Sequence, residues 1–395
     1  MSEYKSAPQI RFKGFSDAWE QRKLEEISNR FDNLRVPVSA NEREKGTTPY
    51  YGANGIKDYV KGFTHNGEYV LIAEDGANDL KNYPVKYVNG LFWANNHVHV
   101  VQGKEGICDN KYLKYCFTKT NIESLLVGGG RAKLNANIMM GIELTVPSFN
   151  EQVELGRMFY ELDNLITLHQ RKYDNLVKVK KSLLEKMFPK NSSNVPEIRF
   201  KGFVDAWEQR KFSDYVEVSD EKNSNDIYNK TDVLSVSGEL GIVNQIELQG
   251  RSFAGSSVSN YGVVNTGDIV YTKSPLKVNP YGIIKSNKGK TGIVSTLYAI
   301  YRPKNITNPF FVQTYFEQNA RVNNYLHPLV NKGAKNDMKV SDSNALLGNV
   351  IFPKKTEQDK IYELFTNLGN LITLHQRKLE KLNELKKSML DKMFI

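Results

Sequence analysis

The sequence predicts an α+β protein made of two similar α/β domains and two long helices, and three observations indicate this class. The phrase IRFKGFSDAWEQRK at 10–23 returns at 198–211 as IRFKGFVDAWEQRK, with one change. The phrase LITLHQRKYDNLVKVKKSLLEKMF at 165–188 returns at 371–394, with 16 of 24 positions identical. The stretches between these phrases are rich in strand-like runs and differ strongly from each other. An internal duplication therefore sets the plan of the chain.

Each half ends in a segment typical of a long helix. Residues 151–188 contain no proline, and their apolar residues recur mostly every three or four positions. A stripe with a period near 3.5 favours pairing with a second helix, and the other copy is the available partner. His169 and His375 hold equivalent positions on the stripe and are expected to pack there. Four leucines are expected to serve the scaffold or a subunit interface: Leu165, Leu176, Leu371 and Leu382.

The duplication divides the chain into four segments. Residues 1–150 and 191–356 are expected to form the two domains. Residues 151–190 and 357–395 are expected to form the two helices, with the polar PKNSSNVPE as linker. Runs such as GEYVLIAEDGA and GIVSTLYAIY are typical of strands, and one helical piece falls late in each domain. We therefore expect one fold that carries two different surfaces.

Composition and charge narrow the class of protein. Hydrophobic residues make up 40% of the chain and charged residues 25%, as in folded proteins. No apolar run is long enough to span a bilayer, and MSEYKSAPQ lacks the apolar core of a leader. The chain has only two cysteines, Cys108 and Cys116, so neither a disulfide framework nor a zinc site is expected. This cysteine content predicts a cytoplasmic location. The net charge of +10 and pI of about 9.2 favour a polyanionic partner.

No enzyme motif is complete, so neither a catalytic residue nor a metal site is expected. KGKTG at 288–292 ends like a phosphate-binding loop, but Ile284 stands where the first glycine is required. VNPYG at 278–282 lacks the second proline of the adenine methyltransferase motif, which favours a turn. His97 and His99 alternate on a strand-like run without an evident third ligand, which favours a strand surface or domain contact.

A constant framework with two unlike faces is the plan of a bipartite reader, and duplex DNA suits a basic protein of this plan. The sequence also resembles a known family. P-x-IRFKGF-x3-W at the start of each half, VP-x3-EQ before the long helix and KKSLLEKMF at its end are similar to the specificity subunits of type I restriction–modification enzymes. YYGANGIKDYV and LIAEDGA in the first variable stretch are similar as well.

The resemblance implies two target-recognition domains, each reading one half of an asymmetric, interrupted double-stranded DNA site. It implies that the helices form an antiparallel coiled-coil spacer and dock two modification subunits. Those subunits would use S-adenosylmethionine, and restriction subunits would add ATP- and Mg-dependent cleavage, whereas this chain would hold no cofactor. The alternative is a non-catalytic coiled-coil scaffold whose basic charge is incidental.

Candidate DNA contacts lie in glycine-rich and aromatic loops. The YYGANGIKDY loop combines amide and aromatic side chains, and GGGRAKLN places two cations beside glycines that let the backbone approach a phosphate. In the second domain VNKGAKNDMK has the same character, and both segments lie shortly before a long helix. The expected DNA-binding residues are Tyr50, Tyr51, Asn54, Lys57, Arg131, Lys133, Arg251, Lys273, Lys332, Lys335, Asn336 and Lys339.

Trp19 and Trp207 are expected to be structural. Both belong to the repeated aromatic phrase, and identical copies could not read two different half-sites. We expect them to pack each domain against the helices or to meet the modification subunit.

Inserting four residues into both long helices is expected to lengthen the unread gap between the half-sites by roughly two base pairs. Four residues add about 6 Å of helix rise, and one base pair takes about 3.4 Å of duplex. Mapping the sites methylated by the assembled enzyme measures this gap. An unchanged gap would contradict the spacer role of the helices.

Overall fold

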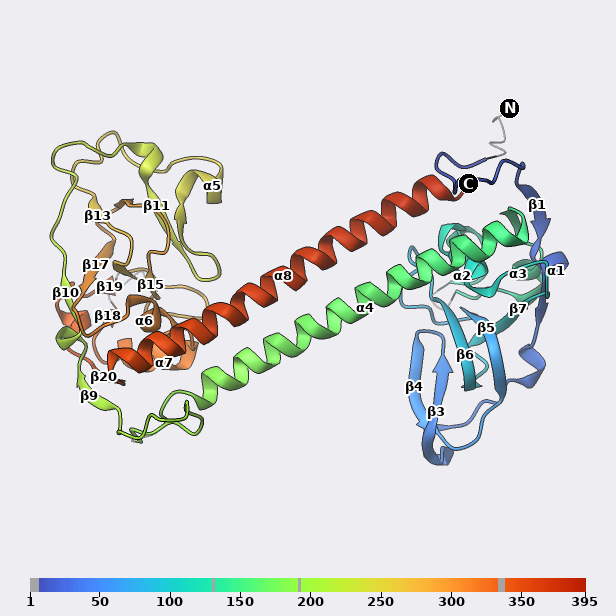
Figure 1. The fold of residues 1–395 in the computed structure, drawn as a ribbon, viewed down its shortest axis with the longest axis horizontal. Helices are drawn as coiled ribbons and strands as arrows, with labels where there is room; N and C mark the ends of the chain where they lie inside the picture. The colour runs from blue at the N-terminus through green and yellow to red at the C-terminus, as the bar shows by residue number, and fades with distance from the viewer. Residues whose placement is uncertain (1–6, 130–131, 191–192, 333–337) are drawn as a thin grey trace. The chain divides into compact units, whose positions relative to one another are not determined.

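The computed structural model describes residues 7–129, 132–190, 193–332 and 338–395 (Figure 1). The chain forms two compact units, which we call unit 1, Met1–Arg171 with His375–Ile395, and unit 2, Lys172–Leu374. Two long helices, α4 at Phe149–Lys186 and α8 at Lys355–Met393, contribute to both units. Each unit combines sheets with helices. The α+β class with two domains and two long helices is confirmed.

The compact units divide the chain differently from the four segments expected from the repeat. The start of each long helix packs on the domain that precedes it, but its end joins the core of the other unit. Phe394, after α8, belongs to the core of unit 1, and Phe188, after α4, to that of unit 2. The four-segment division stays a prediction. Within the described part of the chain, no helix has an apolar run long enough to cross a membrane.

Unit 1 is built on a six-stranded sheet with the strand order β2-β7-β5-β6-β3-β4. The central β5 pairs antiparallel with β6 and β7, and β3 meets β6 in parallel. Strands β1 and β8 form a separate antiparallel pair beside α4. The strands are β1 Glu20–Lys23, β2 Ser28–Arg30, β3 Lys45–Gly52, β4 Gly55–Val60, β5 His65–Ala73, β6 Val85–Ala94, β7 Val98–Gly103 and β8 Glu143–Val146.

Helix α2, Asn110–Lys119, covers strands β5 and β6 of this sheet. It begins after Asp109, whose carboxylate accepts a hydrogen bond from the Tyr112 amide at 2.8 Å. Its buried face carries aromatic and aliphatic side chains that fill the core of unit 1. Two short helices complete the unit, α1 Leu24–Ile27 and α3 Ala136–Met140.

Unit 2 has a smaller four-stranded sheet in the order β10-β17-β14-β15, with antiparallel pairs around it. Its strands are β9 Glu208–Lys211, β10 Val216–Val218, β11 Leu234–Ser237, β12 Gly241–Asn244, β13 Gly262–Val264, β14 Ile269–Thr272, β15 Ile284–Ser286, β16 Gly292–Val294, β17 Tyr298–Pro303, β18 Asn331–Lys332, β19 Met338–Lys339 and β20 Asn349–Phe352. Its short helices are α5 Gln245–Gln249, α6 Pro309–Tyr315 and α7 Asn319–Leu326.

In each unit the first repeated phrase binds the end of one long helix through a backbone hydrogen bond. In unit 1 the Ile10 amide donates to the Lys392 carbonyl in the last turn of α8. In unit 2 the Ile198 amide donates to the Lys186 carbonyl in the last turn of α4, and both distances are 3.0 Å. These bonds satisfy carbonyls that a helix end leaves without a partner.

The next residue of the phrase binds the start of the other long helix. Arg11 makes a two-bond ion pair with Glu151 at 2.6 and 2.7 Å, and Arg199 makes the same pair with Glu357 at 2.7 Å for both bonds. Both glutamates are buried, so each needs its arginine to offset the loss of hydration. The phrase therefore joins the end of one long helix to the start of the other.

The glutamine after each glutamate fastens the helix start to the late helix of the domain. Gln152 accepts from the Asp109 amide at 3.1 Å and donates to the carbonyls of Ile107 and Pro147. Gln358 does the same in unit 2, accepting from the Asn308 amide at 2.8 Å. The repeated Glu-Gln pair thus has one role in both units.

Trp19 and Trp207 lie in the cores, where each packs on the phenylalanine that follows a long helix. The Trp19 ring meets Phe394 edge-on at 6.3 Å, and the Trp207 ring meets Phe188 edge-on at 6.0 Å. Trp19 is 6% exposed and Trp207 1%. Both tryptophans therefore lock a helix end into the domain.

The two long helices pair antiparallel within unit 1. The contacts from Phe159 to Phe394 and from His169 to His375 run in opposite directions along the two helices. The two histidines meet with 2.8 Å between their Nδ1 atoms. Leu176 and Leu382, which lie seven residues after the histidines, are half-buried.

Leu165 and Leu371 are the more exposed of the four expected leucines. They are 47% and 44% exposed, although they come three residues after Leu162 and Leu368 and four before the histidines, a spacing that keeps side chains on one side of a helix. A two-helix pair buries only a narrow stripe. Other apolar residues of the helices, such as Leu155 and Ile361, are buried in the domain cores.

Asp163 of α4 is the polar centre of unit 1's helix packing. Its carboxylate pairs with Lys114 of α2, accepts from the Tyr115 hydroxyl at 2.7 Å and pairs with Lys386 of α8 at 2.6 Å. Burial alone would raise the pKa of Asp163, but the two lysines more than offset it and hold that pKa below its usual value. Three elements thus meet at one carboxylate.

Replacing Asp163 by asparagine is expected to lower the free energy of unfolding at pH 7 by about 2 kcal/mol, because two half-buried cations lose their partner. Since the folded pKa is depressed, this stabilisation is present above the unfolded value of about 3.9 and is lost as pH falls through the folded value. Urea unfolding followed by circular dichroism at pH 7 and pH 3 measures both effects. The exposed Asp214→Asn serves as control, and an equal pH dependence in Asp163→Asn and wild type would refute the assignment.

Candidate nucleic-acid interface

The turn between β3 and β4 is tied to the loop that follows β5. Asn54 donates to the Gly76 carbonyl and accepts from the Asn78 amide, both at 3.0 Å. Gly55 has a φ of +115°, which side-chain-bearing residues rarely adopt, so the turn requires glycine there. Asn54 was expected to contact DNA, and in this structure its amide holds two loops together.

Two lysines lie against this turn. A Cβ atom built on Gly52 would lie 2.3 Å from Cε of Lys57, and one built on Gly55 would lie 3.2 Å from Nζ of Lys86. The two glycines therefore make room for the lysine side chains. Both lysines are exposed. Lys57 was expected from the sequence, whereas Lys86 was missed because only the fold brings β6 to the turn.

Neither tyrosine of the predicted loop offers a free ring. Tyr50 is 1% exposed, and its hydroxyl bonds to the backbone amide and carbonyl of Val38 at 3.2 Å. The Arg43 guanidinium lies over its ring, 4.3 Å from the centroid. Tyr51 is half-buried against the edge of Phe92, and burial raises the pKa of Tyr51. The expected contact of Tyr50 with DNA therefore has no exposed ring to act through.

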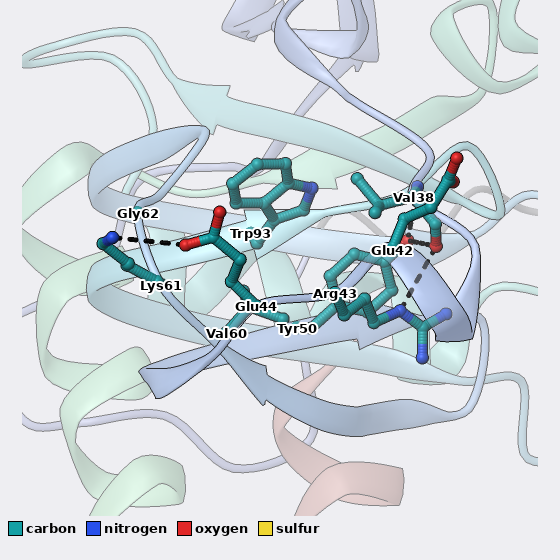
Figure 2. A pocket seen from close by; sticks show the side chains of 9 residues that line it. All are labelled: Val38, Glu42, Arg43, Glu44, Tyr50, Val60, Lys61, Gly62 and Trp93. Carbon is teal, nitrogen blue, oxygen red and sulfur yellow. Dashed lines mark hydrogen bonds and ion pairs between the residues drawn. The ribbon is translucent and has the colours of Figure 1, made fainter.

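A hollow of about 420 Å³ lies beside Tyr50, lined by Arg43, Lys61, Trp93 and others (Figure 2). The Trp93 ring is stacked near Tyr50 at 6.4 Å and donates from Nε1 to the Val36 carbonyl at 2.7 Å. Lys61 pairs with Glu44 at 3.2 Å. Trp93, which the sequence did not single out, is the aromatic side chain that remains half-exposed there.

The first glycine-rich basic segment is a loop closed by its own backbone. Val127 and Lys133 exchange two amide-to-carbonyl bonds of 2.9 Å. The Lys133 ammonium pairs with Glu74 at 2.6 Å. In this structure Lys133 anchors the base of the loop, while the predicted Arg131 lies outside the described residues.

Glu74 belongs to an ion network beneath the loop. It also pairs with Arg35 at 2.5 Å, and Asp32 nearby pairs with His99 at 2.7 Å. Burial would raise the pKa of Glu74, but Lys133 and Arg35 hold it below its usual value. Burial likewise would raise the pKa of Asp32, but His99 outweighs it. The network ties the start of β7 to the loop.

Asp32, Glu74 and His99 have ligand atoms within 4.8 Å of one another, a set that could hold a metal ion. Two cations, however, already bind the Glu74 carboxylate. Both nitrogens of His99 face oxygen atoms, Oδ2 of Asp32 at 2.7 Å and the Leu134 carbonyl at 2.8 Å. These contacts favour an ion network over a metal centre. His97 pairs with Asp75 at 2.6 Å.

The second glycine-flanked segment is closed in a similar way. Strands β18 and β19 pair antiparallel, with Asn331 opposite Lys339 and Lys332 opposite Met338. Lys133 and Lys339 are 206 positions apart, which is the offset of the helix repeat. The backbone of each takes part in the β-pairing that closes its segment. The predicted Lys335 and Asn336 lie outside the described residues.

The two remaining cations of unit 2 differ in their freedom. Arg251 is exposed and lies over the Phe253 ring, 4.6 Å from its centroid. Lys273 is paired with Asp342 at 2.8 Å. Arg251 is therefore the more available of the two for a phosphate.

Residues 16–178 match the family described as the type I restriction modification DNA specificity domain. A Haemophilus influenzae protein provisionally named a type I restriction enzyme specificity subunit is 45% identical over 149 residues, 38% of either chain. The EcoprrI type I restriction enzyme specificity subunit of Escherichia coli is 28% identical over 150 residues, 38% of this chain and 34% of its own. These matches confirm the resemblance, but each spans well under half of either chain.

The fold has a solved counterpart. The crystal structure of the S subunit of a type I restriction–modification system from M. genitalium superposes with a TM-score of 0.63. It covers 98% of this chain and 99% of its own, at 11% identity. At that identity the likeness establishes the fold alone.

Replacing Lys57 or Lys86 by glutamine is expected to weaken binding to duplex DNA to a similar degree for every sequence. Log affinity falls as log salt rises, and each lost phosphate contact should make this negative slope shallower by about 0.9. Titrations of the assembled complex at several salt concentrations measure it. Lys61→Gln, which removes a lysine held by Glu44, is the matched control, and unchanged slopes for Lys57 and Lys86 would rule out this surface.

Proposed function

We propose that this chain, whose residues 16–178 match the type I restriction modification DNA specificity domain, is the DNA-reading subunit of a type I restriction–modification complex. It binds duplex DNA sequence-specifically and is not itself catalytic. Each domain reads one half of a bipartite, asymmetric site. The observation that carries this proposal is that the same contacts to the long helices recur in both units, whereas the surfaces of the two domains differ.

The hydrogen bonds and ion pairs that the repeated residues make with the long helices are equivalent in the two units. The Arg11–Glu151 pair has its counterpart in Arg199–Glu357, with bond lengths that agree within 0.1 Å. The surfaces of the two domains differ: unit 1 has a six-stranded sheet and unit 2 a four-stranded sheet with separate two-stranded pairs. Selection for one assembly geometry and two different DNA sequences accounts for this combination.

Equivalent apolar side chains on the long helices support docking of two modification subunits. Two pairs separated by 206 positions are each 44–47% exposed: Leu165 with Leu371, and Leu168 with Leu374. Exposed leucines that recur at equivalent positions are typical of an interaction surface. We propose that each set receives one modification subunit.

The cofactors belong to the partners in this proposal. The modification subunits use S-adenosylmethionine, and restriction subunits use ATP and Mg. The described residues of this chain contribute DNA recognition and the fixed arrangement of docking surfaces. In this proposal the complex recognises and methylates DNA in the cytoplasm.

Exchanging residues 24–146 for those of a relative with a different target is expected to change one half of the methylated motif and leave the other half intact. Arg11, Trp19 and Glu151 lie outside this stretch, and Gln152 contacts it through backbone atoms. A donor domain that keeps the Lys114 and Tyr115 contacts to Asp163 should therefore dock normally. Sequencing of methylated DNA from cells that also make the modification subunit reads the motif. An unaltered motif would instead favour the coiled-coil scaffold, to which the exposed leucines are also suited.

A further inference from the structure

Arg321 in α7 is an arginine held between two aromatic rings. Its guanidinium carbon lies 4.7 Å from the centroid of the Phe188 ring and 4.8 Å from that of Tyr315. Its Nη1 donates to the Tyr315 carbonyl at 2.8 Å. These contacts fix the guanidinium plane in advance of any ligand.

This guanidinium has no anionic partner within the described residues, where no carboxylate lies within 4.0 Å of it. Burial lowers the pKa of Arg321, and only Tyr315 acts against that shift. A guanidinium has five N–H donors, and the described contacts use one of them. The side chain therefore keeps both charge and donors for a ligand.

Arg321 lines a hollow of about 850 Å³ that lies wholly within unit 2. Lys181 of α4 also lines it, as do the amide side chains of Gln318, Asn319, Asn324 and Asn349. Of the two acids in the lining, Glu317 is already paired with Lys180 at 2.6 Å. Glu185 is the other, so the lining carries more positive than unneutralised negative charge.

We propose that this hollow binds a phosphate group, with Arg321 as its principal partner and Lys181 as a second cation. A fixed guanidinium fork pairs with two oxygens of one phosphate, and the surrounding amides reach the others. A carboxylate has only two oxygens and would leave most of these donors unused. The hollow has room for the sugar attached to a phosphodiester as well as for free phosphate.

The phosphate has two possible sources, the backbone of duplex DNA and a free phosphate or nucleotide. The DNA source rests on the proposed function, because it places a non-specific backbone contact beside the second reading domain. The free source does not depend on it. The experiment has one arm for each.

In the first arm, inorganic phosphate is titrated into the full-length chain by calorimetry. Arg321→Met keeps an apolar side chain between the rings and removes the charge, so its affinity for phosphate should fall by about tenfold or more. Lys181→Met should cause a smaller loss, and Lys178→Met, also on α4 but outside the lining, should cause none. Urea unfolding shows whether Arg321→Met still folds; if it does not, the Lys181 and Lys178 comparison decides.

In the second arm, the assembled complex binds cognate duplex DNA over a range of salt. A backbone source predicts that Arg321→Met lowers the salt slope by about 0.9 and that phosphate competes with DNA. A free source predicts loss of phosphate binding with DNA affinity unchanged. The proposal is overturned if wild type binds no phosphate and Arg321→Met alters no salt slope, or if the variant only weakens capture of the modification subunit, which would indicate an acidic side chain as occupant. Cognate DNA binding by wild type tests the proposed function separately.

Discussion

The buried ion pair between an arginine of the first repeated phrase and the glutamate at the start of a long helix is the interaction on which the two units depend. Glu151 and Glu357 have left water almost completely, and an unpaired carboxylate there would cost several kcal/mol. The two-bond geometry also fixes direction as well as distance. Because the same phrase caps the end of the other long helix through one backbone bond, each unit holds one helix start and one helix end at set positions.

This arrangement explains why the first phrase and the ends of the long helices are repeated closely while the loops diverge. The end of α8 belongs to the core of unit 1 and the end of α4 to that of unit 2, each through a phenylalanine packed on a tryptophan. A change at a helix end thus alters the core of the domain encoded by the other half. The described loop residues do not contribute to the core of the other unit. The loops can therefore differ between the two domains while the contacts to the long helices stay the same.

The loop surfaces obey a different constraint, which is how strongly each charged side chain is already paired. Lys133 and Lys273 are held by acids, and the buried network around Glu74 makes its loop base rigid. Lys57, Lys86 and Arg251 lie exposed, where attraction to phosphate costs little desolvation. Arg321 is a third case, since it is half-buried and stacked yet lacks an acid among the described residues. A surface is therefore suited to a polyanion when its cations are not already paired with acids, whatever the number of cations it carries.

The sequence by itself determined the duplication, the two long helices, the α+β class and the repeated residues of the framework, because all of these leave periodic or identical patterns. It could not determine that Tyr50 is buried under Arg43, that Glu74 binds Lys133, or that Leu165 faces solvent while His169 is paired. These facts depend on contacts between residues that lie far apart in the chain or on separate elements, such as Glu74 with Lys133 and Gly55 with Lys86. Only the tertiary structure brings such groups together, and burial and pairing, which decide whether a charged or aromatic side chain can meet a ligand, exist only there.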